Sequence, residues 1–205
     1  MRNILILFAH PAFEKSRVNI HLVDDLQDIE GVTFFDVYEH YPDMDIDVKE
    51  QQDLLNKHDI IVFHHPFFWY STPSILKEWQ DLVLEHGWAY GAEGNALKGK
   101  LFFNTITTGG RSEAYSVDGF HKVTMRQLLI PIEKTARLCK MIFLPPYVIH
   151  GSHSITPEKV RYHKVDYWEL LELLHNEELD IERAVKLDYL NDYLINDRNR
   201  DKTRI

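Results

Sequence analysis

The segment with the densest set of reactive side chains spans residues 104–121, where a double glycine is followed by a tyrosine and a histidine. Residues 101–103 read as the start of a buried strand that runs into Thr107-Thr108-Gly109-Gly110. Ligands of open parallel sheets bind at the carboxyl ends of strands, and glycine lets bare backbone approach a flat or anionic group. Tyr115 and His121 can donate hydrogen bonds or protons to such a ligand. We therefore expect the chemistry of the protein in this segment.

A second candidate segment follows the first apolar run of the chain. His10 stands at the end of this run, and Ser16-Arg17-Val18-Asn19 begins a predicted helix. A strand, a turn and a helix start form an anion site, in which backbone N–H groups, the Ser16 hydroxyl and the Asn19 amide donate to phosphate oxygens. His10 is expected beside the phosphate or the sugar. Simple N-capping by Ser16 is the alternative. The segment matches neither GxxxxGK[ST] nor GxGxxG, which argues against a nucleoside triphosphate or a dinucleotide fingerprint.

Aromatic residues dominate the loop after the third apolar run, which reads Phe67-Phe68-Trp69-Tyr70. Consecutive aromatics in a loop at the carboxyl edge of a sheet favour a planar ligand. An isoalloxazine ring fits aromatic walls and the backbone N–H groups of Phe68, Trp69, Thr108, Gly109 and Gly110. A hydrophobic plug or a dimer contact is the alternative. Trp88 and Tyr90, in a glycine-flanked loop, are interpreted as a substrate lid or a contact to a second subunit, with core packing of Trp88 as the alternative.

Other signals do not complete a site. Residues 43–54 begin like a calcium loop, but they lack the glycine and the glutamate that the loop needs. The histidine pairs at 64–65 and 150–153 have no cysteine pair or HExxH to complete them, so we predict no metal site. There is no GxSxG, and Cys139 sits in an apolar setting, so nucleophilic catalysis gains no support.

Composition narrows the class of protein. The 205 residues carry 23 Lys plus Arg against 32 Asp plus Glu, a net charge of -9, which argues against nucleic-acid and direct lipid binding. No apolar run approaches the ~20 residues that a membrane-spanning helix needs. A lone cysteine cannot form an intramolecular disulfide, and we expect a cytoplasmic protein, with peripheral attachment to the inner membrane through a protein partner left open.

Apolar runs of strand length alternate with amphipathic stretches of helix length, which predicts a parallel α/β sheet with helices on both faces. The runs cover residues 4–9, 32–38, 60–64, 101–107 and 141–149. Helices are predicted over 19–29, 49–56 and 119–138 and from 72 and 156 onward. Five strands are typical of a flavodoxin-like fold with strand order 2-1-3-4-5. Residues 1–176 are interpreted as a flavin-binding domain, and 177–205 as an extension with a short helix and a frayed tail from 196.

A series of short segments carries a family resemblance. They are Ala9-His10-Pro11, Ser16 with Asn19, Tyr41-Pro42-Asp43 with Ile46-Asp47, His65-Pro66 with Trp69-Tyr70-Ser71, His86-Gly87-Trp88-Ala89-Tyr90-Gly91, Thr107-Thr108-Gly109-Gly110 and Leu144-Pro145-Pro146. In this order and spacing the chain resembles the NAD(P)H dehydrogenase (quinone) family of flavodoxin-fold reductases. It is most similar to the small bacterial members that include KefF and KefG, the ancillary proteins of glutathione-regulated potassium-efflux antiporters.

The resemblance implies a role for each matching position. His10 and residues 16–19 would hold the flavin phosphate and ribityl chain, and residues 67–70 and 107–110 the isoalloxazine. Tyr115 and His121 match a tyrosine and a histidine that bond the pyrimidine edge of the flavin in the larger quinone reductases. Trp69, Trp88 and Tyr90 would contact the substrate, the last two from a neighbouring subunit, which implies a homodimer.

The resemblance also implies a reaction, in which flavin takes hydride from NAD(P)H and passes it to a quinone in a ping-pong cycle. FMN is favoured over FAD because the phosphate loop is short. The alternative is a flavin-binding regulatory subunit of a potassium-efflux antiporter. A one-electron flavodoxin carrier is a third interpretation, but residues 14–17 do not match its phosphate loop.

Overall fold

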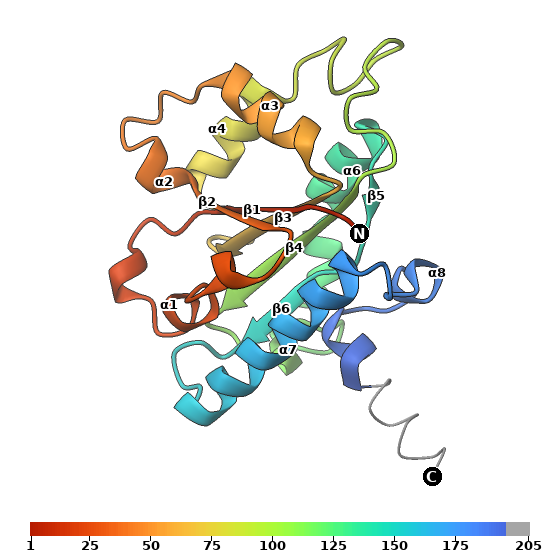
Figure 1. Ribbon diagram of the computed structural model, residues 1–205. Coiled ribbons are helices and arrows are strands. Elements are labelled where there is room, and N and C mark those ends of the chain that lie inside the picture. Colours follow the sequence, from red (N-terminus) through yellow and green to blue (C-terminus); the bar gives the residue numbers. More distant parts are fainter. Residues whose placement is uncertain (196–205) are drawn as a thin grey trace.

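The computed structural model describes residues 1–195 and contains one parallel sheet (Figure 1). Its strands follow the order β2-β1-β3-β4-β5, with β6 paired to β4, which confirms the predicted topology. The strands are β1 (Ile4–Phe8), β2 (Val32–Asp36), β3 (Ile60–Pro66), β4 (Leu101–Thr108), β5 (Ile142–Phe143) and β6 (Tyr147–His150). All pairings are parallel, so the carboxyl ends of β1, β3, β4 and β6 meet at one edge.

The fifth position of the sheet is split in two. β5 pairs with the start of β4, where Phe102 lies opposite Phe143, and β6 pairs with its end, where Thr105 lies opposite Tyr147. Between them stand Pro145 and Pro146, which have no N–H to donate to a ladder. The single strand predicted over 141–149 is therefore two short strands.

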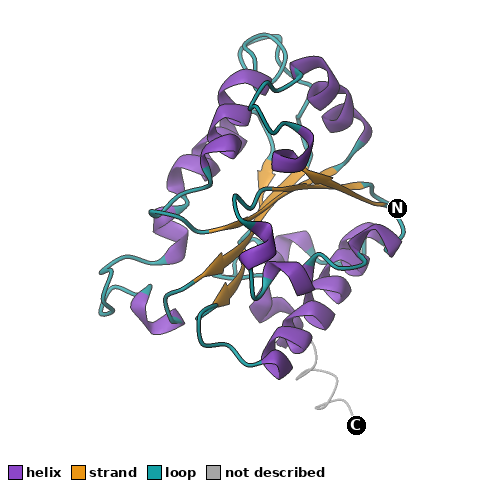
Figure 2. Ribbon diagram, turned by 90° about the vertical axis from the view of Figure 1, so that its left-hand side faces the viewer, coloured by secondary structure: helices purple, strands orange, loops and turns teal. Residues whose placement is uncertain are grey.

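Helices cover both faces of the sheet (Figure 2). One face carries α2 (Val37–His40), α3 (Val48–Lys57), α4 (Ser74–Val83), α5 (Met125–Leu128) and α6 (Ile130–Leu138), and the other carries α1 (Asn19–Leu22), α7 (Pro157–His175) and α8 (Ile181–Ala184). Short 3-10 turns lie at Phe13–Lys15, Leu26–Asp28 and Ser112–Ala114. Alternate residues of β1 enter opposite cores, with Leu5 and Leu7 in one and Ile4 and Ile6 in the other.

Three predicted boundaries were wrong for local reasons. The helix predicted over 19–29 stops after α1, because Asp25 is left-handed with a φ of 65°. Instead of one helix over 119–138, α5 and α6 form, with Pro131 in the first turn of α6, where its missing N–H is not needed. β2 ends at Asp36 because its carboxylate accepts from the amides of Tyr38 and Glu39 and caps α2.

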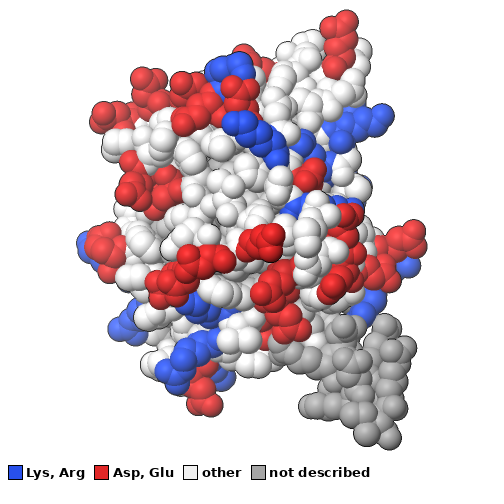
Figure 3. All heavy atoms as spheres, viewed as in Figure 1, with Lys and Arg blue, Asp and Glu red and all other residues white. Residues whose placement is uncertain are grey.

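The extension after α7 packs on the core that lies between the sheet and helices α1 and α7. Its buried apolar residues are Leu179, Ala184, Leu190, Tyr193 and Leu194. The short helix predicted from the apolar spacing over 184–194 is interrupted: α8 ends at Ala184, residues 185–190 are not helical, and residues 191–195 are helical. The predicted frayed tail, residues 196–205, lies outside the described residues. None of the helices within residues 1–195 is long and apolar enough to cross a bilayer. On the face seen in Figure 3, acidic groups are widespread and basic groups scattered, without a basic stripe.

Candidate functional site

Three loops at the carboxyl edge of the sheet enclose a cleft with a volume of about 310 Å³. They follow β1, β3 and β4, the three strands from whose ends the sequence predicted ligand contacts. A fourth loop, after β6, closes the remaining side. The lining residues are His10, Lys15, Ser16, Arg17, Val18, Asn19, Pro66, Phe67, Phe68, Thr107, Gly109, Ser152 and His153. The structure thus brings the predicted phosphate loop together with Phe67, Phe68, Thr107 and Gly109, whereas the predicted Tyr70, Thr108 and Gly110 do not line the cleft.

Asn19 is the hydrogen-bonded centre of the phosphate loop. Its Nδ2 donates to Ser16 Oγ at 3.1 Å and to Thr107 Oγ1 at 3.0 Å, and its Oδ1 lies 3.1 Å from His64 Nε2. The side chain is 2% exposed, so both amide N–H groups are used inside the protein. The expectation that the Asn19 amide donates directly to a phosphate therefore gives way to a different role: it ties residues 16–19 to β4.

Donors at the phosphate end come mainly from the backbone. The amides of Arg17 and Val18 make no hydrogen bond to any residue within 1–195, and both residues line the cleft. Arg17 Nη1 donates to the carbonyl of His153 at 3.1 Å, which links this loop to the loop after β6. Ser16 Oγ accepts from the Asn19 amide at 2.9 Å, so its own proton remains available to a ligand. This end of the cleft suits an anion.

The surroundings of His10 favour the neutral form of its imidazole. Its Nδ1 accepts from the amide of Ala12 at 3.2 Å, which leaves the proton on Nε2. Burial lowers the pKa of His10, although the nearby Glu14 carboxylate acts in the opposite direction. The ring lies 6.3 Å from Phe68, roughly perpendicular to it. His10 can therefore donate one hydrogen bond from the cleft wall without carrying a charge.

The aromatic loop is a tight turn between β3 and α4. The amide of Phe68 donates to the carbonyl of Ser71 at 3.1 Å, and the Ser71 amide returns a bond of 2.9 Å. Trp69 and Tyr70 between them have φ of 48° and 65°, the left-handed region that non-glycine residues rarely adopt. The predicted amide donor of Phe68 is thus already paired. Trp69 is 93% exposed at the tip of the turn and does not line the cleft.

Side chains pack closely on both glycines after β4. A Cβ on Gly109 would lie 2.5 Å from His153 Nε2, and one on Gly110 would lie 2.9 Å from the ring of Tyr115. Both distances are too short for real contacts, and neither glycine has a positive φ. A methyl group at Gly110 would collide with the buried Tyr115, whereas one at Gly109 would require the exposed His153 to turn away. Gly109 lines the cleft with bare backbone.

Tyr115 and His121 lie together behind this wall. The Tyr115 hydroxyl is 2.5 Å from Thr108 Oγ1, and its ring stacks on His121 with centroids 4.6 Å apart. His121 Nδ1 lies 3.4 Å from the hydroxyl of Tyr70, which joins the aromatic turn to the pair. Tyr115 is buried and His121 is half-buried, and neither side chain lines the cleft. The two side chains thus contact each other, and their action on a bound ligand stays a prediction.

The loop after β6 supplies residues that the sequence interpretation missed. Ser152 and His153 line the cleft, and the Ser152 amide donates to the carbonyl of Thr108 at 3.0 Å. His150, at the end of β6, lies 5.5 Å from Tyr115, and burial lowers its pKa to about 4 against an opposing hydrogen bond to Gly110. Their position at a strand's carboxyl end was the available signal, but these histidines were weighed only as metal ligands.

Trp88 and Tyr90 do not line the cleft. Both are half-buried against the core that contains α3 and α4, in the loop that follows α4. The Tyr90 ring lies 5.3 Å from His86 at 78°. Their predicted approach to the site of a neighbouring subunit stays a prediction.

The signals rejected on sequence grounds have structural explanations. Within residues 1–195 no group of three or more His, Cys, Asp or Glu is arranged to hold a metal. His64 is completely buried and burial lowers its pKa to about 3, so it serves as a neutral donor to Asn19. Burial raises the pKa of the Cys139 thiol to about 11, which keeps it protonated and unreactive.

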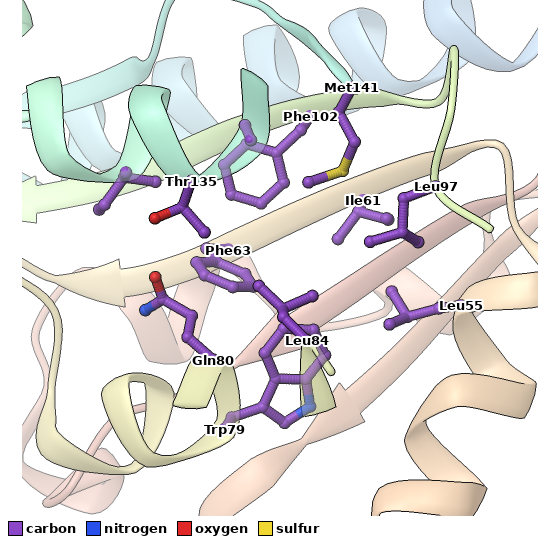
Figure 4. A pocket seen from close by; sticks show the side chains of 12 residues that line it. Leu55, Ile61, Phe63, Trp79, Gln80, Leu84, Leu97, Phe102, Thr135 and Met141 are labelled. Carbon is purple, nitrogen blue, oxygen red and sulfur yellow. The ribbon is translucent and has the colours of Figure 1, made fainter. Parts of the chain in front are cut away.

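A separate enclosed cavity lies under α4 and α6, away from the cleft (Figure 4). Figure 4 shows Phe63, Trp79 and Met141 among the side chains that surround it. Its volume of about 10 Å³ is that of one water-sized probe, and its walls are mainly apolar. It is a small packing gap in the core and has no room for an organic ligand.

Comparison with known proteins gives consistent matches. The family model described as flavodoxin-like fold matches residues 2–171. The ancillary protein KefG of the glutathione-regulated potassium-efflux system of Pectobacterium atrosepticum is 44% identical over 155 residues, 76% of this chain and 85% of that protein. The crystal structure of general stress protein 14 from Treponema denticola in complex with FMN is 35% identical, covers 84% of this chain and 99% of that chain, and has a TM-score of 0.80. An NADPH-quinone reductase from P. pentosaceus is 28% identical, covers 82% and 96%, and has a TM-score of 0.75.

Proposed function

The chain belongs to the flavodoxin-like fold family, and on that premise we propose that it is an FMN-dependent oxidoreductase that transfers hydride from NAD(P)H to a quinone. The observation that carries the proposal is the cleft itself. It has an anion-binding end at Ser16, Arg17 and Val18, an aromatic side at Phe67 and Phe68, and a flat backbone wall. These are the three surfaces that a phosphorylated, planar, polar-edged cofactor needs. The FMN held by a similar protein of Treponema denticola supports the choice of cofactor.

The residues present fit FMN. The unpaired amides of Arg17 and Val18 and the Ser16 hydroxyl would hold the phosphate, and His10 would donate to the phosphate or the ribityl chain. Gly109 leaves bare backbone for the ring in the cleft that Phe67 and Phe68 also line, and Thr107 and Thr108 tie this segment to the rest of the site through Asn19 and Tyr115. When bound, FMN would supply a centre that accepts hydride from one substrate and gives it to another.

Tyr115 and His121 are proposed as the catalytic pair. His121 can donate from Nε2 to the ring edge on which negative charge develops, while Tyr70 and Tyr115 fix the plane of the imidazole. A preorganised donor of this kind is worth roughly 10² to 10³ in rate. The Tyr115 hydroxyl and Thr108 Oγ1 share one hydrogen bond, and when Thr108 is its donor the Tyr115 proton is left for the flavin edge.

The proposal includes assembly and location. A homodimer would bring Trp88 and Tyr90 of one subunit, with the exposed Trp69 of the other, to the substrate side of the cleft. Trp69 at 93% exposure is a large apolar side chain that a substrate or a second subunit would cover. We place the protein in the cytoplasm and keep residues 1–176 as the flavin-binding domain with 177–205 as its extension.

The decisive test is the visible spectrum of the purified full-length chain, with the released flavin identified after denaturation. We expect a yellow protein that releases FMN and oxidises NADH or NADPH only when a quinone is supplied. The matched control is His153→Ala, which removes a cleft-lining side chain but leaves the amides of residues 17 and 18 in place. Colourless protein that takes up no added FMN would overturn the proposal.

The similarity to KefG favours a second candidate function, that of a regulatory subunit of a potassium-efflux antiporter. The two functions are compatible, since a flavin-loaded dimer can dock on a partner and also turn over. Binding to an immobilised cytosolic domain of such an antiporter, measured with and without FMN, tests it. If the chain does not bind the domain with or without FMN, the regulatory function is refuted and the oxidoreductase function is retained.

A further inference from the structure

The C-terminal extension, residues 177–195 of the described chain, lies beyond the family match, which ends at residue 171. Its buried side chains share a core with α7, and α8 lies beside the C-terminal end of α7 (Figure 1). The extension is therefore packed on the same body that carries the candidate site. Two of its residues, Tyr189 and Asn191, are only half-buried, and their contacts lead toward that site.

Asn191 completes the outer edge of β6. Among the described strands β6 pairs with β4, so its other edge needs partners. The Val148 amide donates to Asn191 Oδ1 at 2.9 Å, and Asn191 Nδ2 donates back to the Val148 carbonyl at 3.1 Å. The Leu190 amide also donates to the carbonyl of Pro146 at 3.0 Å. Because Val148 is 4% exposed, loss of Asn191 would leave buried backbone groups unpaired.

Tyr189 begins a row of rings that ends in the site. It lies edge-on to His150, with centroids 5.9 Å apart at 89°. His150 lies 5.5 Å from Tyr115, and Tyr115 lies 4.6 Å from His121. A backbone hydrogen bond also links the end of β6 to the glycine segment, because the Gly151 amide donates to the carbonyl of Gly110 at 2.9 Å. A displacement of β6 or of the His150 ring would therefore move the glycine wall and Tyr115 together.

We propose that Asn191 and Tyr189 are positioning residues of the site, Asn191 by holding β6 in place and Tyr189 by holding the His150 ring behind Tyr115. The contacts by themselves support the coupling between the extension and the segment that carries Gly110 and Tyr115. The effect of this coupling on turnover rests on the proposed function. A site of this kind must hold its groups to about 0.5 Å, and the extension supplies the outer support of one wall. The chain thus extends the family fold with a segment that stiffens its own cofactor cleft.

The test uses two variants of the full-length chain, Tyr189→Ala and Asn191→Leu. Three quantities are measured well below the melting temperature. They are the hydrogen–deuterium exchange of residues 108–111 without flavin, the affinity for FMN, and the rate of flavin reduction by NADPH. We expect exchange to rise about tenfold and FMN affinity and reduction rate to fall about three- to tenfold in both variants. Tyr189→Phe keeps the ring and should restore wild-type behaviour.

Leu179→Ala, or the milder Leu179→Val, is the matched control. It removes buried volume from the same extension, and the amide of residue 179 donates to the Leu173 carbonyl and not to β6, so it should lower the melting temperature without changing the cleft. If exchange at residues 108–111 rises no more in Tyr189→Ala and Asn191→Leu than in this control, the inference is overturned.

Two further outcomes separate the inference from the proposed function. Raised exchange in a protein that takes up no FMN would support the positioning role and refute the flavin function. Raised exchange with wild-type FMN affinity and reduction rate would show that the extension only stabilises the fold, and would overturn the positioning role.

Discussion

Replacing Asn19 with leucine tests whether the hydrogen-bonded centre between the phosphate loop and β4 holds the site together. Leucine has a similar volume but breaks the contacts to Ser16 Oγ at 3.1 Å, Thr107 Oγ1 at 3.0 Å and His64 Nε2 at 3.1 Å. Thr107 and His64 are buried, so each would lose its partner away from water. An unpaired buried polar group costs about 1–3 kcal/mol, and for the pair we expect a loss of about 2–4 kcal/mol in the free energy of unfolding.

That loss has a measurable size. In a protein of this length 1 kcal/mol lowers the melting temperature by about 2–4 °C, so Asn19→Leu should melt about 4–16 °C lower. FMN affinity, followed by the quenching of flavin fluorescence, should fall at least about tenfold, because the turn that carries Ser16 is no longer tied to β4. Asn56→Leu makes the same chemical change at an exposed position of α3 and should shift the melting temperature by less than ~2 °C.

Asn19→Asp sharpens the test. The hydroxyls of Ser16 and Thr107 and the Nε2–H of His64 can all donate to a carboxylate, so the aspartate variant can keep the contacts. It should melt closer to the wild type than the leucine variant, yet bind FMN weakly, because a buried negative charge faces the phosphate end. A leucine variant that melts within ~2 °C of the wild type and binds FMN equally well would refute this reasoning.

Further variants test His121, the two glycines after β4 and the buried His64. His121→Gln should slow flavin reduction by NADPH about 10²-fold while FMN affinity stays within about threefold, and an unchanged stopped-flow rate would remove its catalytic role. Gly110→Ala puts a methyl 2.9 Å from the buried Tyr115 ring and should weaken FMN binding more than Gly109→Ala, which meets only the exposed His153; equal losses would contradict the wall geometry. His64 has a folded pKa of about 3 against 6.5 unfolded, so the unfolded chain binds the extra proton and stability falls as pH drops below 6.5. Urea titrations should show about 2 kcal/mol lost between pH 7 and pH 5 through this group, and His64→Gln should flatten that slope.

Much of the fold could be read from local patterns. Residues 4–9, 60–63 and 101–103 are apolar at consecutive positions, which happens when both faces of a strand are covered, and all three segments became part of central strands. Predictions failed where a single residue decided a boundary. The left-handed Asp25 and the Asp36 cap shortened elements that hydrophobic periodicity alone would have continued.

The candidate site was predicted as three loops and found as four. The loops after β1, β3 and β4 each contain residue types typical of ligand contacts, so the sequence was sufficient to select them. Ser152 and His153 also follow a strand's carboxyl end, but their place in the cleft depends on facing Gly109 across a strand pairing that is distant in sequence. The sequence interpretation also overestimated the number of free donors, since Asn19 and the Phe68 amide are used by partners that only the folded chain brings near.

The sequence by itself determined the parallel α/β architecture and the chemical character of each strand end, because periodicity and residue type are local properties. The tertiary structure decided which donors remain free, which side chains pack on the two glycines, and that the extension reaches His150 through Tyr189. Those properties depend on distances between residues far apart in the chain, which are set by packing across the sheet edge. The segment from the double glycine to His121 was identified from sequence, but the support behind it became visible only in the fold.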